Sequence, residues 1–517
     1  MATTSNLYRW HHQNVKLTIS PLTISPLTLG IVRRQGLRNT IISYFGLGLG
    51  FVNTTFLLPR FLEPGQLGLV QVLVSIATIY AQLSAFGFAS AGIRFFPYFR
   101  DAERRHHGFL PLLLGVPLLG FGVMTALFFL GKPLLLSLYT ERAAIAAYYP
   151  WIAVLAFFTL LYSLQDAYLK GLYHTAFSSF LQEVLLRVLI AGVALLFGLG
   201  YISFPQFVLA YLGVNSGLTL LLTAYLAYIR ELHLRPTRAV LHVRPVRELL
   251  GFGAFALLSN ISGTVITTID ALMLGSKESL AAAGIYAIAS NISIALVIPS
   301  RALNKIAFPL LADYWKDQDL PRMAAFYRNT TRLLTVLGCW LALGIGLNLD
   351  FIYHLIHRPA YAAGTVAVLL LLAGRLLDSI TGLNGLIVVT SPRYRYDLIF
   401  NASLALATVG LNLLLIPRFG LTGAALAALL ALAGINLART WFVWHSYRMQ
   451  PFTWRIVGVL VVAAVAGTAA WLVPFVHSYL VTMAMRSVVL TGLYGGLLLV
   501  LGLVPEAKPW LRKLRGR

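Results

Sequence analysis

The chain has 517 residues, of which 11% are charged and 58% are hydrophobic, and its mean hydropathy is +0.79. Because soluble domains are about 25% charged, this composition excludes a water-soluble enzyme and a disordered chain, and it indicates an integral membrane protein. The net charge of +23 would suggest nucleic-acid binding in a soluble protein, and the single cysteine excludes a disulfide framework.

Apolar stretches of about twenty residues recur along the chain, each long enough to cross a ~30 Å hydrocarbon core as a helix. Residues 1–36 precede them and are predicted to form a cytoplasmic tail. The sequence predicts an all-α polytopic membrane protein with about fourteen transmembrane helices. The expected helices lie near residues 37–57, 67–91, 109–130, 147–168, 176–198, 204–228, 249–272, 281–298, 333–349, 362–388, 396–416, 423–444, 456–473 and 480–504.

These helices fall into groups that are separated by basic segments. Residues 37–230 hold six helices, 231–248 form a basic cytoplasmic linker, and 249–445 hold six more helices. A last helix pair occupies 446–505 and is followed by a basic cytoplasmic tail at 506–517. With the N-terminus inside, roughly thirty Lys and Arg fall on inner segments and roughly seven on outer ones, as the positive-inside rule requires. Both termini are therefore predicted to be cytoplasmic, and nucleic-acid binding is rejected because the charges are dispersed among short loops.

The two groups of six helices share short motifs in the same order. The pattern F-P-x-x-x-D occurs at residues 96–101 and 308–313, and Gly68 and Gly284 occupy matching places at the start of helices two and eight. Gly200 and Gly420 open helices six and twelve in the same way. Because six is an even number, both groups insert with the same orientation. The sequence thus predicts two six-helix lobes related by a pseudo-two-fold axis along the membrane normal, a plan typical of secondary transporters.

A glycine-rich first helix leads into residues 60–68, which have the form R-x-L-x-P-x-x-x-G. Together with the helix count, the two lobes and the extra C-terminal pair, this opening resembles the polysaccharide-flippase family of the multidrug/oligosaccharidyl-lipid/polysaccharide exporter superfamily. The resemblance implies a bacterial inner-membrane flippase that moves undecaprenyl-linked oligosaccharide repeat units, such as those of O-antigen, to the periplasmic face. It implies as partners the lipid-linked oligosaccharide, membrane lipids, a polysaccharide polymerase and glycosyltransferases.

The family has no strict sequence motif for its positively charged lumen. Candidate residues are therefore chosen by the free-energy cost of placing a charge inside the membrane. Charges inside a transmembrane helix are expensive and tend to face a bundle interior or a wet cavity. Glu183 and Arg187 lie four residues apart in the fifth helix, and Arg375 and Asp378 lie three apart in the tenth. Either arginine could line a cavity that receives a diphosphate, because guanidinium binds phosphate oxygens in a bidentate manner. The alternative is that each arginine is neutralised by its own neighbour.

Polar residues near the helix centres could either contact a substrate or hydrogen-bond to a neighbouring helix. The tetrad S-N-I-S occurs at residues 259–262 and again at 290–293, so Asn260 and Asn291 would lie near mid-membrane if helices seven and eight are antiparallel neighbours. Their amides could meet the sugars of a substrate, or they could hold neighbouring helices together. Asn53 and Asn384 are treated in the same way.

Charges nearer the helix ends give two further candidates. Asp270 lies toward the outer end of helix seven and is either a cation-coupling carboxylate or a solvated acid close to the interface. Arg94, Arg301 and Lys305 lie at the cytoplasmic ends of helices two and eight. They either gather anionic phosphate at an inward mouth or anchor the helices at the interface.

The sequence carries no recognisable nucleotide or metal motif, so no cofactor is expected. Gly46, Gly48 and Gly50 lie inside a membrane helix without a βαβ context, and His354 and His357 lack further ligands nearby. We therefore expect a transporter that works by alternating access and draws on an ion gradient, the membrane potential or product removal. The alternatives are a cation-coupled multidrug exporter of the same superfamily and, less favoured, a membrane-embedded glycosyl transferase or polymerase, which would need a large catalytic loop.

Overall fold

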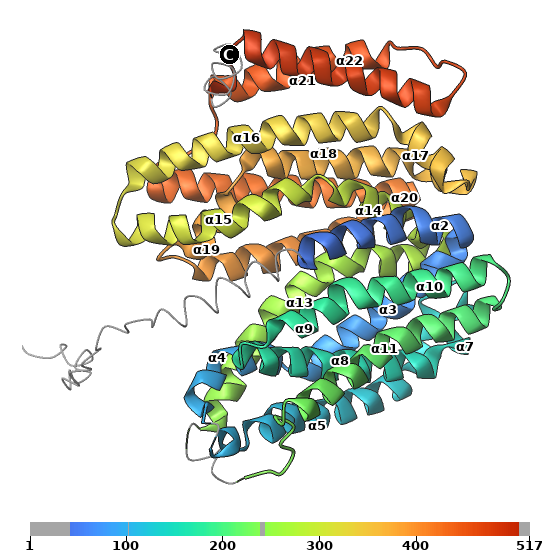
Figure 1. Cartoon of the computed structure of the whole chain (residues 1–517), viewed down its shortest axis with the longest axis vertical. Helices are drawn as coiled ribbons and strands as arrows, with labels where there is room; N and C mark the ends of the chain where they lie inside the picture. The colour runs from blue at the N-terminus through green and yellow to red at the C-terminus, as the bar shows by residue number, and fades with distance from the viewer. Residues whose placement is uncertain (1–41, 102, 238–242, 244, 506–517) are drawn as a thin grey trace, which may run out of the picture.

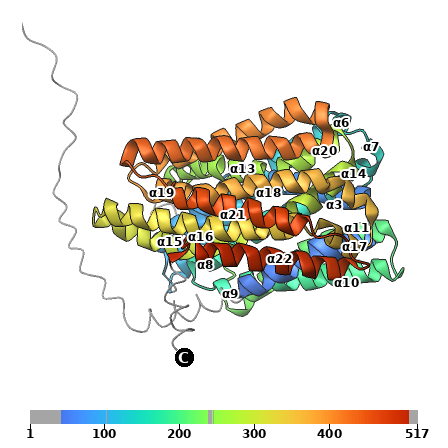
Figure 2. The same cartoon turned by 90° about the horizontal axis from the view of Figure 1, so that it is seen from above.

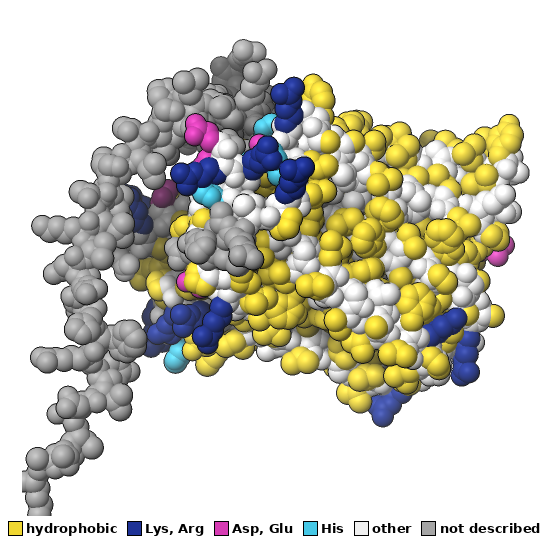
Figure 3. Space-filling view, turned by 90° about the horizontal axis from the view of Figure 1, so that it is seen from below, with side chains coloured by type: hydrophobic (Ala, Val, Ile, Leu, Met, Phe, Trp, Pro, Cys, Tyr) yellow, Lys and Arg dark blue, Asp and Glu magenta, His cyan; other side chains and the backbone are white. Residues whose placement is uncertain are grey.

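The computed structural model describes residues 42–101, 103–237, 243 and 245–505, and within these ranges the regular secondary structure is helical, without a β-strand. This confirms the predicted all-α class. Figure 3 shows a broad hydrophobic surface, with charged side chains gathered mainly toward one end of the molecule. The predicted tails at 1–36 and 506–517 lie outside the described residues, as does part of the predicted linker.

The first half of the chain begins with a helical span, Ile42–Phe61, which contains a π-helical turn, η1. A capping box between Glu63 and Gln66, with Pro64 in the first turn, starts the next helix, α3. The remaining elements follow with short connections. Their bounds are η1 Asn53–Leu57, α2 Leu58–Phe61, α3 Pro64–Ala85, α4 Phe88–Phe99, η2 Arg105–Gly108, α5 Phe109–Leu130, α6 Lys132–Ser137, α7 Arg142–Ala147, α8 Tyr149–Gly171, α9 Thr175–Phe180, η3 Leu181–Leu185, α10 Leu186–Gly198 and α11 Phe204–Tyr228.

The second half of the chain is also built of helices joined by short connections. Its helices are α13 Val246–Lys277, α14 Leu280–Ile294, α15 Val297–Lys316, α16 Leu320–Gly346, α17 Leu349–Ile356, η4 Pro359–Gly364, α18 Thr365–Thr381, α19 Asn384–Thr390, α20 Arg395–Tyr447, α21 Trp454–Trp471 and α22 Tyr479–Val500. The second predicted helix of each half is broken. Helix α3 is separated from α4 by left-handed Phe86 and Gly87, and α14 is bent by 51° relative to α15. The F-P-x-x-x-D motif lies in or at the end of the later part in both cases, which supports the predicted repeat.

Among the described residues, eleven helices are long and apolar enough to cross a membrane, or up to thirteen if each of two bent pairs is one span. Helix α20 has 53 residues and would be roughly 80 Å long if it were straight, well beyond a ~30 Å hydrocarbon core. It is broken at Gly420 (φ 53, ψ −131), between the eleventh and twelfth predicted helices. The exact number of fourteen spans stays a prediction.

The helices are arranged as two bodies with an appended pair (Figure 1). Helices α3 to α11 form the lower body in that view, and α14 to α20 form the upper body. Helix α13 packs on α20 and also on α3 and α4, so it contacts both bodies. Helices α21 and α22 pack on α16 at the edge of the upper body (Figures 1 and 2). The predicted lobe boundaries remain a prediction.

The two ends of the helix bundle differ in the elements that lie there and in their content of arginine. The Arg-rich end holds the end of α4, η2, the end of α15 and α19, at the left of Figure 1. The α2 end, at the right, holds α2, α7 and α17.

Candidate functional site

The matching glycines Gly68 and Gly284 face each other where α3 packs on α14, at the α2 end. A Cβ atom on Gly68 would overlap the backbone of Leu280 and Gly284, and a Cβ atom on Gly284 would overlap the backbone of Pro64 and Gly68. Glycine permits such close helix contact because it has no side chain. The two bodies are thus in direct backbone contact at this point.

Two side chains from the segment around η4 reinforce this contact. The Arg358 guanidinium donates to the carbonyl oxygens of Arg60 (3.3 Å) and Phe61 (3.2 Å), and the Tyr361 hydroxyl donates to the carbonyl of Leu62 (3.0 Å). The last carbonyl groups of a helix have no hydrogen-bond donor within the helix. At the end of α2, the second half of the chain supplies these donors. We call the Gly68–Gly284 contact together with these hydrogen bonds the α2-end seal.

Three cations lie toward the other end of the upper body. Arg301 and Lys305 of α15 are exposed, and the Lys305 Nζ lies 5.2 Å from the ring centroid of Tyr44 in the first helix. Arg375 of α18 is half-buried and lies within electrostatic range of Arg301. In the part of the chain that the structure describes, no carboxylate forms an ion pair with any of the three. We call Arg301, Lys305 and Arg375 the basic cluster.

Arg375 is held by the second S-N-I-S tetrad and not by Asp378. Its Nε donates to the Ser293 hydroxyl (2.8 Å) and its Nη2 to the Ser290 hydroxyl (3.4 Å). Asp378 accepts a hydrogen bond from Asn436 (3.1 Å) instead. The hydroxyl groups satisfy some of the guanidinium N–H groups, and Asp378 lies within electrostatic range of the guanidinium without forming an ion pair with it. The remaining N–H groups can bind an anion.

Asn384 belongs to a polar network that joins α19 to α20. Its amide donates to Asn436 Oδ1 (3.0 Å) and to the Thr440 hydroxyl (3.2 Å), and the residue is 3% exposed. Asp378 reaches the same network through Asn436. This geometry favours interhelical hydrogen bonding over contact with a substrate for both residues.

Arg187 and Glu183 form an ion pair on one face of η3 and α10. The backbone carbonyl of Arg187 also accepts a hydrogen bond from the buried Asn53 amide (2.6 Å) of the first helix. A Cβ atom on Gly50 would overlap the Arg187 side chain, so the guanidinium packs against that glycine. Of the two arginines singled out from the sequence, Arg187 is therefore the one neutralised by its own neighbour.

The two tetrad asparagines lie in different surroundings. The Asn260 amide on α13 donates to the Ser90 hydroxyl of α4 (3.1 Å). Asn291 on α14 lines a small cavity of about 50 Å³ together with Thr54 of η1 and Tyr211 of α11. Each amide thus lies between the two bodies, but the two face different helices.

Asp270 is hydrogen-bonded within the protein and lies about two turns before the end of α13. It accepts from the Tyr286 hydroxyl of α14 (2.5 Å) and from the Asn412 amide of α20 (2.6 Å). The Asn412 carbonyl oxygen is buried without a partner among the described residues. These oxygen atoms come from three helices, which is not the setting of a solvated acid at a helix end.

Arg94 is exposed on α4 and packs over an aromatic ring of α13. Its guanidinium carbon lies 4.4 Å from the ring centroid of Phe252. Such stacking leaves the guanidinium edge available while it fixes the side chain at the Arg-rich end.

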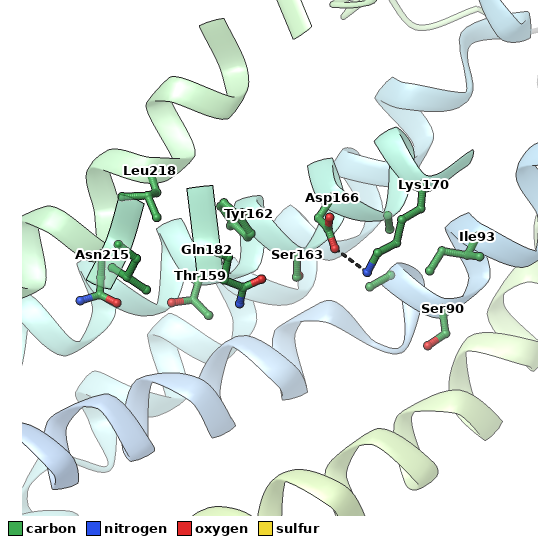
Figure 4. Close-up of a pocket in the computed structure, with 13 residues that line it drawn as sticks. Ser90, Ile93, Thr159, Tyr162, Ser163, Asp166, Lys170, Gln182, Asn215 and Leu218 are labelled. Atoms are coloured by element: carbon green, nitrogen blue, oxygen red, sulfur yellow. Dashed lines mark ion pairs between the residues drawn. The ribbon is translucent and has the colours of Figure 1, made fainter. Parts of the chain in front are cut away.

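A polar cavity between membrane-spanning helices is not predicted from the sequence. It has a volume of about 340 Å³ and lies in the lower body between α4, α8, η3 and α11 (Figure 4). Asp166 and Lys170 of α8 line it and form an ion pair of 2.6 Å. In the sequence, Lys170 is one of the inner-segment cations that follow the positive-inside rule, and neither residue of this pair is predicted to line a site. We call this cavity the α8 pocket.

Comparisons with known proteins agree with this architecture. A family model described as "Polysaccharide biosynthesis protein" matches residues 57–351, more than half of the chain. The structure is similar to "Lipid II flippase MurJ, inward closed conformation" with a TM-score of 0.69 and 11% identity, covering 90% of this chain and 99% of that chain. It is also similar to an inward-facing "multidrug resistance MATE family transporter of the MOP superfamily" with a TM-score of 0.60 and 14% identity, covering 77% and 93% of the two chains. At these identities the likeness shows the fold, and no curated protein matches the sequence.

Proposed function

The chain belongs to the polysaccharide biosynthesis protein family, and from this premise we propose that it is a flippase for polyprenyl-diphosphate-linked oligosaccharide units. In this proposal the Arg-rich end faces the cytoplasm of a bacterial inner membrane, as the positive-inside rule predicts. The cargo supplies surface polysaccharide synthesis, so glycosyltransferases act before the flippase and a polymerase acts after it.

The observation that carries the proposal is the basic cluster. Arg301, Lys305 and Arg375 present positive charge without a paired carboxylate among the residues that the structure describes, and Lys305 lies against Tyr44 of the first helix. A diphosphate carries negative charge on several oxygens, which guanidinium and ammonium groups bind by charge-assisted hydrogen bonds. The polyprenyl tail would remain in the lipid while the headgroup enters between the two bodies.

The α2-end seal supports alternating access. It holds the two bodies together at one end, while the exposed cations Arg301 and Lys305 lie toward the other. A cargo released at the α2 end would require this seal to open. The membrane potential, negative inside, would favour outward movement of an anionic headgroup by ~2.3 kcal/mol per charge per 100 mV.

Asp270 is the proposed coupling site. Its carboxylate lies beside the Asn412 side chain between α13 and α20, and the Asn412 side-chain oxygen has no partner among the described residues. Hard cations prefer such oxygen ligands. Exchange of a cation or a proton at this carboxylate would couple transport to an ion gradient.

Reconstituted protein tests the proposed cargo directly. In proteoliposomes, a fluorescent polyprenyl-diphosphate-linked oligosaccharide should become accessible to a membrane-impermeant quencher at least tenfold faster than in protein-free vesicles. Cationic dyes, the cargo expected of a multidrug exporter, should not be transported. Transport of the dyes without movement of the lipid-linked sugar would establish the exporter alternative instead.

Substitution of the basic cluster tests how the headgroup is bound. Arg375→Ala and Arg301→Ala should each lower transport at subsaturating cargo about tenfold, because a hydrogen bond to a charged group contributes about 1.5–3 kcal/mol. Arg375→Lys should retain part of the activity, since it keeps the charge but loses the planar fork. Arg418→Ala, which removes an exposed cation elsewhere on α20, is the matched control. Full activity of both cluster variants would contradict the basic-cluster proposal.

A further inference from the structure

A polar stripe runs along one face of α8 in the lower body. Thr159, Ser163, Asp166 and Lys170 follow one another at spacings of four, three and four residues, which places them on the same side of a helix. The stripe begins in the last turn of α8 and reaches the middle of the helix, a length of roughly 16 Å, or about half of a hydrocarbon core. Polar side chains at this depth normally face protein or a wet cavity and not lipid.

The stripe faces the α8 pocket, and residues from neighbouring helices complete its lining. Gln182 of η3, Asn215 of α11 and Ser90 of α4 border the same cavity (Figure 4). The volume of about 340 Å³ falls within the range of small-molecule sites, about 300–1,000 Å³. The Lys170 side chain is 46% exposed, so the pocket is open to its surroundings at the end of α8.

Several hydrogen-bonding groups in this lining have no protein partner. Within the described ranges, neither the Thr159 hydroxyl nor the Gln182 side-chain amide forms a hydrogen bond; Thr159 is half-buried and Gln182 is exposed. Asn215 donates to the carbonyl of Tyr211 (2.8 Å), which leaves its own side-chain oxygen unpaired. Groups that are unpaired at membrane depth require water or a ligand, because lipid offers no hydrogen bonds.

The charge of the pocket decides the class of ligand. Asp166 and Lys170 neutralise each other at 2.6 Å, so the lining carries no net charge and does not favour a diphosphate or a metal cation. Amides, hydroxyls and one ion pair present donors and acceptors together, which suits neutral hydroxyl groups. The α8 pocket thus differs in chemistry from the basic cluster.

We infer that the α8 pocket binds a neutral sugar ring of the cargo while the basic cluster holds its diphosphate. This inference rests on the proposed function and adds a second subsite to it. In this arrangement the sugar forms hydrogen bonds with Gln182, Thr159 and Asn215, and the Asp166–Lys170 pair lies at the open end of the pocket. The flippase therefore senses the sugar as well as the lipid diphosphate.

Binding measurements on the full-length protein in lipid nanodiscs test the inference with two probes. One probe is polyprenyl diphosphate that carries a neutral N-acetylhexosamine, and the other is the same lipid without sugar. The wild-type protein should bind the sugar-bearing lipid at least tenfold more tightly. Gln182→Leu and Thr159→Val should each reduce that preference to about threefold or less, because the ligand's hydrogen bonds are lost. Their affinity for the bare lipid should stay unchanged.

Thr468→Val on the exposed side of α21 is the matched control and should keep the full preference. Equal wild-type affinities for the two lipids, or a preference that survives in both pocket variants, would overturn the sugar subsite and leave the flippase proposal intact. Failure of the wild-type protein to bind either lipid would overturn the proposed function as well.

Discussion

Gly68→Val and Gly284→Val are each expected to lower transport at least tenfold. A valine side chain at either position would overlap the backbone of the opposing helix. Backbone cannot move aside as the end of a flexible side chain can, so α3 and α14 would have to separate. The α2-end seal would then no longer close, and the state open at the Arg-rich end would lose population.

Cysteine labelling reports the separation independently of transport. The natural Cys339 is buried, which keeps background labelling low. Leu62 is 1% exposed beneath the α2-end seal, so Leu62→Cys should react slowly in the wild-type background and at least tenfold faster when Gly68→Val is added. Gly410→Val is the control, because nothing lies within 4 Å of a Cβ atom at Gly410. Normal transport and unchanged labelling in the Gly68 and Gly284 variants would show that the seal does not govern access.

The sequence predicted the membrane helices well because their length and apolar content follow directly from the bilayer. It placed helix ends less well. Helix α16 begins at Leu320, well before the apolar stretch predicted near 333–349, and α15 continues to Lys316 beyond the stretch predicted near 281–298. Hydropathy marks where a helix lies in lipid, whereas backbone hydrogen bonds continue the helix into polar surroundings.

The breaks within helices were also difficult to predict. The sequence predicts one helix near 67–91, but left-handed Phe86 and Gly87 divide it into α3 and α4. A single glycine among apolar residues is weak evidence for a break, because membrane helices tolerate glycine. Its role becomes clear only when the close approach of Gly253 on α13 is known.

One contact within a helix could be predicted from its spacing, while the contacts between helices could not. The Glu183–Arg187 pair follows from the four-residue spacing. The partners of Arg375 are Ser290 and Ser293, which lie more than 80 residues away in the chain, so they depend on how α14 packs against α18. The α8 stripe did carry a sequence signal, since Thr159, Ser163, Asp166 and Lys170 recur at helical spacing.

The α8 pocket could not be predicted without knowledge of the fold. Gln182 and Asn215 come from two other helices, and neither residue stands out in the sequence from the many polar side chains that join helices. Polar residues that pair with each other and polar residues that face a cavity look alike until the helices are placed together.

Asp270→Asn is expected to abolish the response of transport to an imposed sodium or proton gradient. The substitution keeps the size of the side chain and removes the negative charge that the proposed coupling ion would bind. Transport driven by the gradient should fall at least tenfold, while slow exchange of lipid-linked sugar without a gradient should persist. Asp350→Asn, which changes an exposed carboxylate on α17, should leave the gradient response intact.

Asp270→Ala separates this coupling role from a structural one. Removal of the carboxylate leaves the Tyr286 hydroxyl and the Asn412 amide without their partner, and an unpaired buried polar group costs about 1–3 kcal/mol. The alanine variant should therefore unfold at a lower temperature than the asparagine variant, although both lose the gradient response. If Asp270→Asn keeps a wild-type gradient response and only Asp270→Ala is impaired, the carboxylate serves to join α13, α14 and α20, and the coupling ion binds elsewhere.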